Sequence, residues 1–117
     1  MAVGDTRTLI GQALARLGED VPPLRRLKLV LRLELPSRGD TAVWRVEVPG
    51  PKIARDPAAD ARLDVSVARS NFNALAEKGG LREWVEAYEH GHVRVSGEPA
   101  VVKLIGGVIS RQLARAH

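Results

Sequence analysis

Hydrophobic and polar residues alternate over residues 27–35, which is the clearest local pattern in the chain. Leucine occupies every odd position there, and Lys28, Val30, Arg32 and Glu34 lie between the leucines. This period of two predicts a strand with one buried face, although leucine, lysine, arginine and glutamate each favour helix. The turn residues at 37–40 then predict a hairpin, so the next strand is expected to pair antiparallel.

Further segments repeat this alternation and predict four more strands. The second strand is expected to turn Ala42, Trp44, Val46 and Val48 inward, and a short third strand covers residues 52–55. The fourth and fifth strands are expected where valine and leucine alternate with polar residues, at Leu63, Val65 and Val67 and at Val93 and Val95.

Helical spacing of apolar residues predicts four helices. The first covers residues 5–17, with Asp5 or Thr6 as its N-cap and Gly18 as its end. Two short helices follow residue 69, one capped by Ser70 and closed by the glycines at 79–80, the other over residues 81–88. The last begins at Pro99. We therefore expect one α+β domain over residues 1–117, in the order α-β-β-β-β-α-α-β-α, with helices on one face of a mainly antiparallel five-stranded sheet.

The final helix carries an unusually wide apolar face. At 100° per residue its apolar side chains cover about 180° of the circumference, whereas a helix resting on a sheet needs about 100°. The excess must face a deeper core, a partner subunit or an apolar ligand. If the excess faces an apolar ligand, Leu104 and Val108 are expected to face the cavity, and Gln112, near the middle of the arc, is the candidate to bind the ligand's head group.

Composition narrows the class of protein. The chain has 117 residues and no cysteine, which excludes disulfides, thiol nucleophiles and zinc–thiolate sites. No apolar run approaches the roughly 20 residues of a membrane span, and the first residues lack the apolar stretch of a signal peptide. We expect a soluble intracellular protein.

The net charge of +4 raises the question of nucleic-acid binding. The 18 basic residues are interleaved with 14 acidic ones, and the aromatic residues are too few for a base-stacking platform. We therefore expect no nucleic-acid partner. The densest basic stretch, Arg25, Arg26, Lys28 and Arg32, is either a solvated face or a surface that transiently contacts anionic membranes.

Candidate chemistry is sparse. No serine-nucleophile or phosphate-loop motif occurs. His90 and His92 could chelate a metal but have no evident further ligand, so we interpret them as exposed turn residues. Asp56, Asp60 and Asp64 straddle a turn and a strand, and we interpret them as solubilising charges. The sequence predicts no catalytic group, metal or cofactor, and hence no enzyme.

What remains is apolar capacity: a sheet with one leucine- and valine-rich face and a helix with a wide apolar arc. This combination suits a pocket for an apolar molecule. The pattern alone favours an ordinary filled core over such a pocket.

An ordered series of motifs covers about residues 59–109. It runs from an acidic turn and an alternating strand through a polar-capped helix and an aromatic-containing helix to a strand, a glycine and a helix with Lys103 and Leu104. This series resembles the sterol carrier protein type 2 family, also called non-specific lipid-transfer proteins. Upstream, Trp44 with Val46 and Val48 resembles the family's tryptophan-bearing second strand. The chain ends in Leu-Ala-Arg-Ala-His rather than a peroxisomal Ser-Lys-Leu, so we expect a cytoplasmic, bacterial protein.

The resemblance implies an apolar tunnel that binds sterols, fatty acids, acyl-CoAs or phospholipids without a covalent step. The alternative is an interaction or dimerisation module that uses the apolar face of the final helix. We expect a monomer or weak homodimer. We expect the cavity to be lined by Leu29, Leu31, Trp44, Val46, Phe72, Leu75, Trp84, Leu104, Val108 and Gln112.

Overall fold

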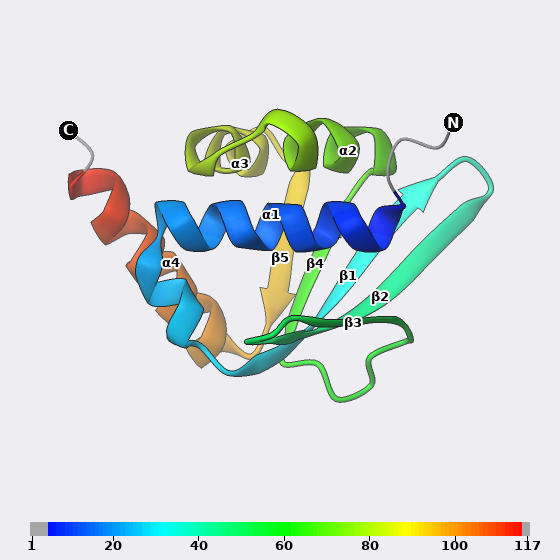
Figure 1. Ribbon diagram of the computed structural model, residues 1–117, viewed down its shortest axis with the longest axis horizontal. Helices are drawn as coiled ribbons and strands as arrows, with labels where there is room; N and C mark the ends of the chain where they lie inside the picture. The colour runs from blue at the N-terminus through cyan, green and yellow to red at the C-terminus, as the bar shows by residue number, and fades with distance from the viewer. Residues whose placement is uncertain (1–4, 116–117) are drawn as a thin grey trace.

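A computed structural model describes residues 5–115, and its elements follow the expected order with one added 3₁₀ helix. The N-terminal half holds one helix, the 3₁₀ helix and three strands, and the C-terminal half holds two strands and three helices (Figure 1). The elements are α1 (Thr6–Asp20), η1 (Pro22–Arg26), β1 (Leu29–Ser37), β2 (Asp40–Val48), β3 (Lys52–Arg55), β4 (Leu63–Val67), α2 (Arg69–Lys78), α3 (Leu81–Glu89), β5 (Val93–Gly97) and α4 (Pro99–Arg115).

The five strands form one mixed sheet in the order β3-β2-β1-β4-β5. The β1–β2 hairpin pairs Leu29 with Val48 and Ser37 with Asp40, which confirms the predicted turn. β3 and β5 also pair antiparallel with their neighbours. β1 and β4 alone run parallel, with Leu31 opposite Leu63, so the expectation of a mainly antiparallel sheet is confirmed.

The two faces of the sheet differ as the alternation predicts. Leu33 and Leu35 on β1 are buried on the inner face. On the outer face, Arg32 and Glu34 form an ion pair of 2.7 Å with both side chains about one-third exposed. The charged half of the β1 alternation therefore meets solvent, while the leucine half meets the helices.

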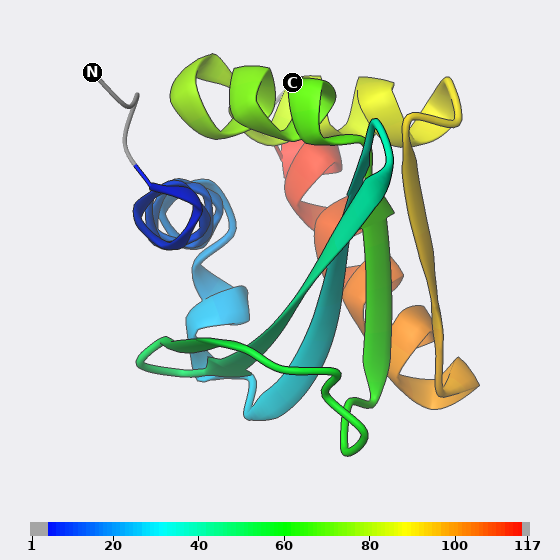
Figure 2. The ribbon, with the colours of Figure 1, turned by 90° about the vertical axis from the view of Figure 1, so that its right-hand side faces the viewer.

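The helices surround the inner face from three sides (Figures 1 and 2). α1 crosses in front of the sheet, α2 and α3 lie along its upper end, and α4 lies with η1 at the side of β5. Contacts join α1 to α2 and β3, and join α4 to β5 and η1. The cover over the sheet is thus assembled from separate pieces rather than one layer.

Several element ends differ from the sequence-based prediction. The helix capped by Asp5, whose carboxylate accepts the Thr8 N–H at 2.7 Å, continues through Gly18 to Asp20. The first strand begins at Leu29 rather than residue 27, because the preceding prolines start a 3₁₀ helix. α2 has Ala68 as its N-cap, so the prediction that Ser70 caps it is wrong.

Three polar contacts fasten α1 to the two helices above it. The Arg69 guanidinium donates to the Thr6 hydroxyl at 2.6 Å, and the Arg16 guanidinium donates to the Gly79 carbonyl at 3.3 Å. The Asp20 carboxylate accepts the Leu81 N–H at 2.9 Å and so caps α3. Both ends of α1 are therefore held to the α2–α3 layer.

Candidate ligand-binding site

The buried apolar side chains form two separate clusters instead of one continuous core. The first joins α1, α2 and the sheet and contains Leu35, Val46 and Phe72. The second joins η1, α3 and α4 and contains Val21, Leu81 and Val108. A domain of this size usually has one contiguous core, so the region between the two clusters is the first candidate for a ligand site.

The inner face of the sheet is closed at one end and open at the other. At the end beneath α2, the inward side chains of β1, β2, β4 and β5 are at most 6% exposed. We call these residues, Leu35, Ala42, Val67 and Val93, the closed half. Towards the opposite end, four inward side chains remain half-buried. We call Leu29, Leu31, Val48 and Ile53 the open half. Their neighbours Val46 and Leu63 on the same face are buried, at no more than 5% exposed.

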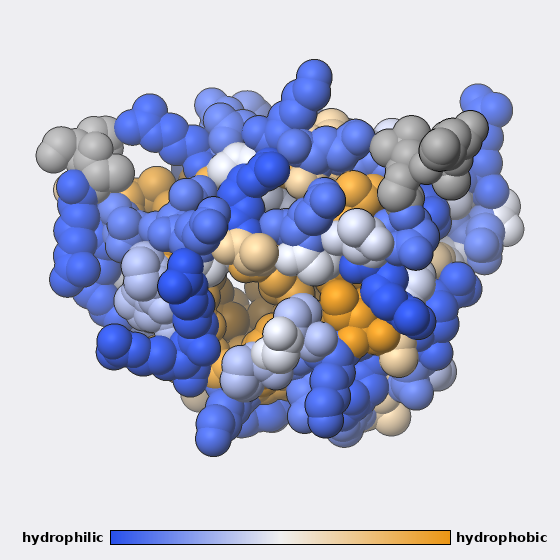
Figure 3. Space-filling view, in the orientation of Figure 1, coloured by the Kyte–Doolittle hydropathy of each residue, from blue (hydrophilic) through white to orange (hydrophobic). Residues whose placement is uncertain are grey.

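The surface is hollowed beside the open half. Figure 3 shows the depression just below α1, between η1 and β3, with hydrophobic side chains on its walls. Half-buried apolar residues pack against both clusters near α1, among them Leu14 with the first cluster and Leu17 with the second. α1 therefore forms one wall of an apolar hollow that opens to solvent.

The structure distributes the ten predicted lining residues among different environments. Trp44, Val46 and Phe72 are buried inside the first cluster. Leu31, Leu75 and Trp84 are half-buried at the margin of that cluster, and Leu29 is half-buried at the start of β1. Val108 belongs to the second cluster, while Gln112 is half-buried further along α4.

Leu104 lies outside the interior. Its side chain is 49% exposed, on the same helical stripe as the exposed Arg111 and Arg115. The buried face of α4 is instead centred on Val101 and Val108. The prediction that Leu104 faces the cavity is therefore corrected: the apolar arc of α4 is wide, but its edge turns towards solvent.

The burial of α4 bears on the alternative function. Val101 and Val108 point into the fold, and Ile109 and Leu113 pack against the second cluster. Little of the arc besides Leu104 is left to bind another protein. An interaction or dimerisation module using this face is not favoured.

Other half-buried residues on the inner face were absent from the predicted set. Val48 and Ile53 share the inner face with Val46, and Val65 and Val95 lie opposite each other on β4 and β5, all half-buried. Strand alternation places them on the inner face and could have identified them. The contribution of Leu14 and Leu17 on α1 could not be inferred in this way, because helical spacing does not show which part of a sheet a helix covers.

Two buried indole N–H groups have no hydrogen-bond partner among the residues that the structure describes: Trp44 Nε1 and Trp84 Nε1. Leaving such a donor unsatisfied costs about 1–3 kcal/mol. The Trp84 ring meets Phe72 edge-on at 6.2 Å between centroids, and the Arg55 guanidinium lies 5.3 Å from the centre of the Trp44 ring. Each indole thus has its ring packed while its one polar atom is buried and unpaired within residues 5–115.

Two pockets lie elsewhere on the surface. One of about 250 Å³ lies at the closed end and includes Ser66, Asn71, His92 and Arg94. The other, of about 340 Å³, lies between α1, α3 and α4 and has Gln112 in its wall, with the apolar Leu81 and Leu113 beside it. Gln112 is thereby the one predicted site residue that lines either of these pockets.

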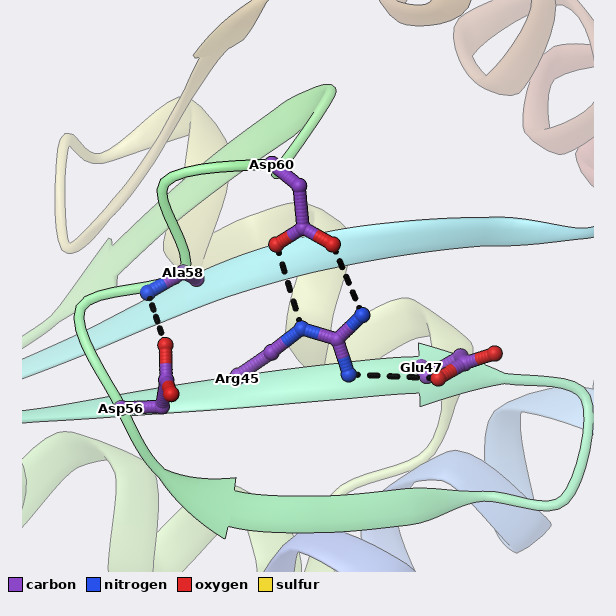
Figure 4. Close-up of polar contacts among 5 residues, drawn as sticks. All are labelled: Arg45, Glu47, Asp56, Ala58 and Asp60. Carbon is purple, nitrogen blue, oxygen red and sulfur yellow. Dashed lines mark hydrogen bonds and ion pairs between the residues drawn. The ribbon is translucent and has the colours of Figure 1, made fainter.

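Two of the three aspartates singled out in the sequence, Asp56 and Asp60, serve local structure (Figure 4). Asp60 forms a two-pronged ion pair with Arg45, at 3.1 and 2.8 Å, and these bonds lower the pKa of Asp60. Glu47 accepts a third bond from Arg45 at 3.2 Å, and Asp56 accepts the Ala58 N–H at 2.7 Å. These contacts tie the loop between β3 and β4 to the outer face of the sheet.

Within residues 5–115, no group of three or more histidine, cysteine or acidic side chains could hold a metal ion. His90 and His92 are exposed, with ring centroids 6.3 Å apart. The same residues include no helix long and apolar enough to cross a membrane.

Comparison with known proteins places this geometry among sterol carrier folds. No protein-family model and no curated protein matches the chain significantly. Among solved structures, palmitated SCP2L2 from Aedes aegypti is similar with a TM-score of 0.64 and 21% identity, over 91% of this chain and 95% of that one. Sterol carrier protein 2 from Yarrowia lipolytica in its apo form has a TM-score of 0.52 and 17% identity, over 84% of this chain and 92% of that one. The SCP2 domain of the ubiquinone synthesis protein UbiJ has a TM-score of 0.50 and 18% identity, over 95% of this chain and 96% of that one.

The chain therefore has the sterol carrier protein 2 fold, a five-stranded mixed sheet with four helices. The order of motifs along the sequence indicated this fold, and the structural comparison confirms it. At these identities the likeness establishes the fold, and the ligand has to be argued from this chain's own residues.

Proposed function

We propose that this protein is a non-catalytic carrier that binds one long-chain apolar molecule between α1 and the open half of the sheet. The observation that carries the proposal is the hollow between two incomplete core clusters, with half-buried apolar side chains facing it. Candidate ligands are a fatty acid, an acyl-CoA, a sterol or a phospholipid.

Burial of apolar surface supplies the driving force. Covering apolar area removes it from water at about 25 cal/mol per Å², so a long chain that covers the open half and the facing side of α1 stabilises the complex. Leu31 and Ile53 on the sheet and Leu14 on α1 would contact such a chain. We expect Trp44, Val46 and Phe72 of the first cluster and Val108 of the second cluster to bound the ligand from within the fold.

The head group has two kinds of candidate partner. The buried indole N–H groups of Trp44 and Trp84 are donors without acceptors in the part of the chain that the structure describes. Gln112 offers a half-buried amide at the pocket beside Leu81. Because these groups are neutral, they favour hydrogen-bonding heads of several kinds rather than one charge type, and we expect weak head-group selectivity.

The solved neighbours support a carrier. One of them is named as a palmitated protein and another as a sterol carrier in its apo form. We further propose that this chain acts in the cytoplasm as a monomer or weak dimer. In native mass spectrometry, a co-purifying lipid would favour the carrier, and an empty dimer would favour the dimerisation module.

A titration of delipidated protein tests the proposal. Fatty acids, fatty alcohols, acyl-CoAs and sterols would be titrated while the fluorescence of the two tryptophans is followed. Ile53→Asp puts a charge into the hollow and should weaken binding at least tenfold. Ala54→Asp is the matched control, because Ala54 is the exposed neighbour on the same strand. If no compound binds below roughly millimolar concentration, the carrier function is wrong.

A further inference from the structure

The positive charge of the protein is concentrated on two elements that are distant in sequence and adjacent in space. η1 with the residues that follow it, 22–28, and α4 together contain six basic residues and no acidic one. Removing these six from the 18 basic residues leaves 12 against 14 acidic ones, so the rest of the chain is slightly negative. The six are Arg25, Arg26, Lys28, Lys103, Arg111 and Arg115, and with Leu104 we call them the basic face.

These charges are available to a partner. All six side chains are exposed, and none forms an ion pair within residues 5–115. By contrast, Arg32, Arg45 and Arg62 elsewhere on the surface each pair with a carboxylate at 3.2 Å or less. η1 contacts α4, and both lie at the same end of the molecule (Figure 1).

An exposed leucine lies within the basic face. Leu104 is 49% exposed and shares its helical stripe with Arg111 and Arg115. A lone leucine among arginines gains nothing from a hydrophilic partner, whereas it can enter the boundary between lipid head groups and acyl chains. The chain's four aromatic residues all lie outside η1 and α4, so the basic face offers no aromatic ring on which nucleic-acid bases could stack.

We propose that the basic face docks the protein on an anionic lipid bilayer, with Leu104 entering the interface. Attraction of basic side chains by an anionic leaflet supplies the affinity, and salt screens it. η1 belongs both to the basic face and to the rim of the hollow below α1, so docking would hold the rim near the bilayer. The basic face is argued from charge and exposure alone and does not depend on the proposed carrier function.

Vesicle co-sedimentation tests the docking. The intact chain would be mixed with vesicles of phosphatidylcholine alone or with about one-third phosphatidylglycerol, at low and high salt. Binding should require the anionic lipid and fall as salt rises. Arg26→Gln combined with Arg111→Gln should weaken binding on the order of twentyfold, since each basic residue contributes about fivefold. Arg38→Gln combined with Arg94→Gln removes the same charge from exposed sites elsewhere and should change binding less than about threefold.

A third variant separates the leucine from the charges. Leu104→Ser should weaken vesicle binding while leaving its salt dependence unchanged, because it removes insertion but no charge. Thermal unfolding of each variant confirms that it is folded.

Four results would overturn the proposal: no vesicle binding, equal binding to neutral and anionic vesicles, equal losses in both double variants, or binding to a short RNA or DNA duplex as tight as to anionic vesicles. Fatty-acid titration without vesicles reports on the carrier function separately, so either idea can fail alone.

Discussion

The two ends of β1 differ although their sequence pattern is the same. Leu35 is completely buried beneath α2, whereas Leu29, on the same face of the same strand, stays half-buried. The hydrophobic period fixes which face of a strand turns inward, but the second layer decides whether that face is covered. The closed half is packed like a hydrophobic core, whereas the open half leaves apolar side chains partly exposed to solvent.

The largest expected effect is a difference in the free energy of unfolding between two leucine-to-alanine variants, one at each end of β1. Leu35→Ala should lower the free energy of unfolding by about 2–5 kcal/mol, the usual range for a buried leucine. Leu29→Ala should cost about 1 kcal/mol or less, because its side chain has fewer contacts to lose. Denaturant unfolding of the ligand-free protein measures both, and similar losses would show that the open half is packed after all.

Enlarging a side chain gives the converse test on β4. Val67 is 1% exposed, so Val67→Phe should overpack the closed half and cost about 1–3 kcal/mol. Val65 faces the same way two residues earlier and is half-buried, so Val65→Phe should be tolerated within about 1 kcal/mol. Thermal unfolding and a fatty-acid titration would be read together. Val65→Phe should reduce ligand affinity because its ring occupies the hollow, and unchanged affinity would place the ligand elsewhere.

Removal of an unpartnered donor should have a smaller effect. Trp84→Phe keeps an aromatic ring against Phe72 but removes the N–H that has no acceptor. In the ligand-free protein, removing the cost of the unsatisfied N–H offsets part of the lost packing. The free energy of unfolding should therefore change by less than about 1 kcal/mol. A loss above about 2 kcal/mol would mean that the indole N–H is satisfied, for example by a water molecule.

The smallest expected effect concerns the ion pair that joins the start of β4 to the start of α4. Arg62 donates to both oxygens of Glu98, at 3.0 and 3.1 Å, and these bonds lower the pKa of Glu98 below its ordinary value of 4.5. A lowered carboxyl pKa stabilises the fold above the ordinary value, and this contribution is lost as the pH falls through the folded-state pKa.

Glu98→Gln should therefore lower stability slightly near neutral pH and make no difference in strong acid. Unfolding followed at several pH values measures this convergence. Because the pair is exposed, salt should shrink the gap between the two proteins. A gap that widened as the pH fell would contradict the assignment.

The fold could be read from the sequence where a pattern depends on neighbouring residues. The alternating leucines of β1, the Ser37–Asp40 turn and Pro99 at the start of α4 each act over a few residues, and each prediction is confirmed. The predicted start of α2 was wrong because Ser70, a residue type that suits an N-cap, is the second residue of the helix. Ala68 takes the N-cap position without a side-chain hydrogen bond.

The candidate site was less predictable because it depends on distances between elements. Leu104 and Val108 are close on the helical wheel, yet one is exposed and the other buried. Nothing local distinguishes them; what differs is the depth to which η1 and α3 cover α4. Likewise, the contribution of α1 to the hollow follows from where α1 crosses the sheet, which its own sequence does not encode.

The parallel pair at the centre of the sheet has a consequence for how the chain folds. β1, β2 and β3 can pair with one another through short turns, but β1 finds its second neighbour only at β4, where Leu31 meets Leu63. Closing that long loop costs chain entropy before the pairing contributes any free energy, which slows folding. A chain still being synthesised, with its end short of β4, holds β1 with one edge unpaired and its leucine face uncovered by α2. During that interval the unpaired edge of β1 can associate with other chains. Once the C-terminal half is complete, β4 pairs with this edge and α2 covers the leucine face.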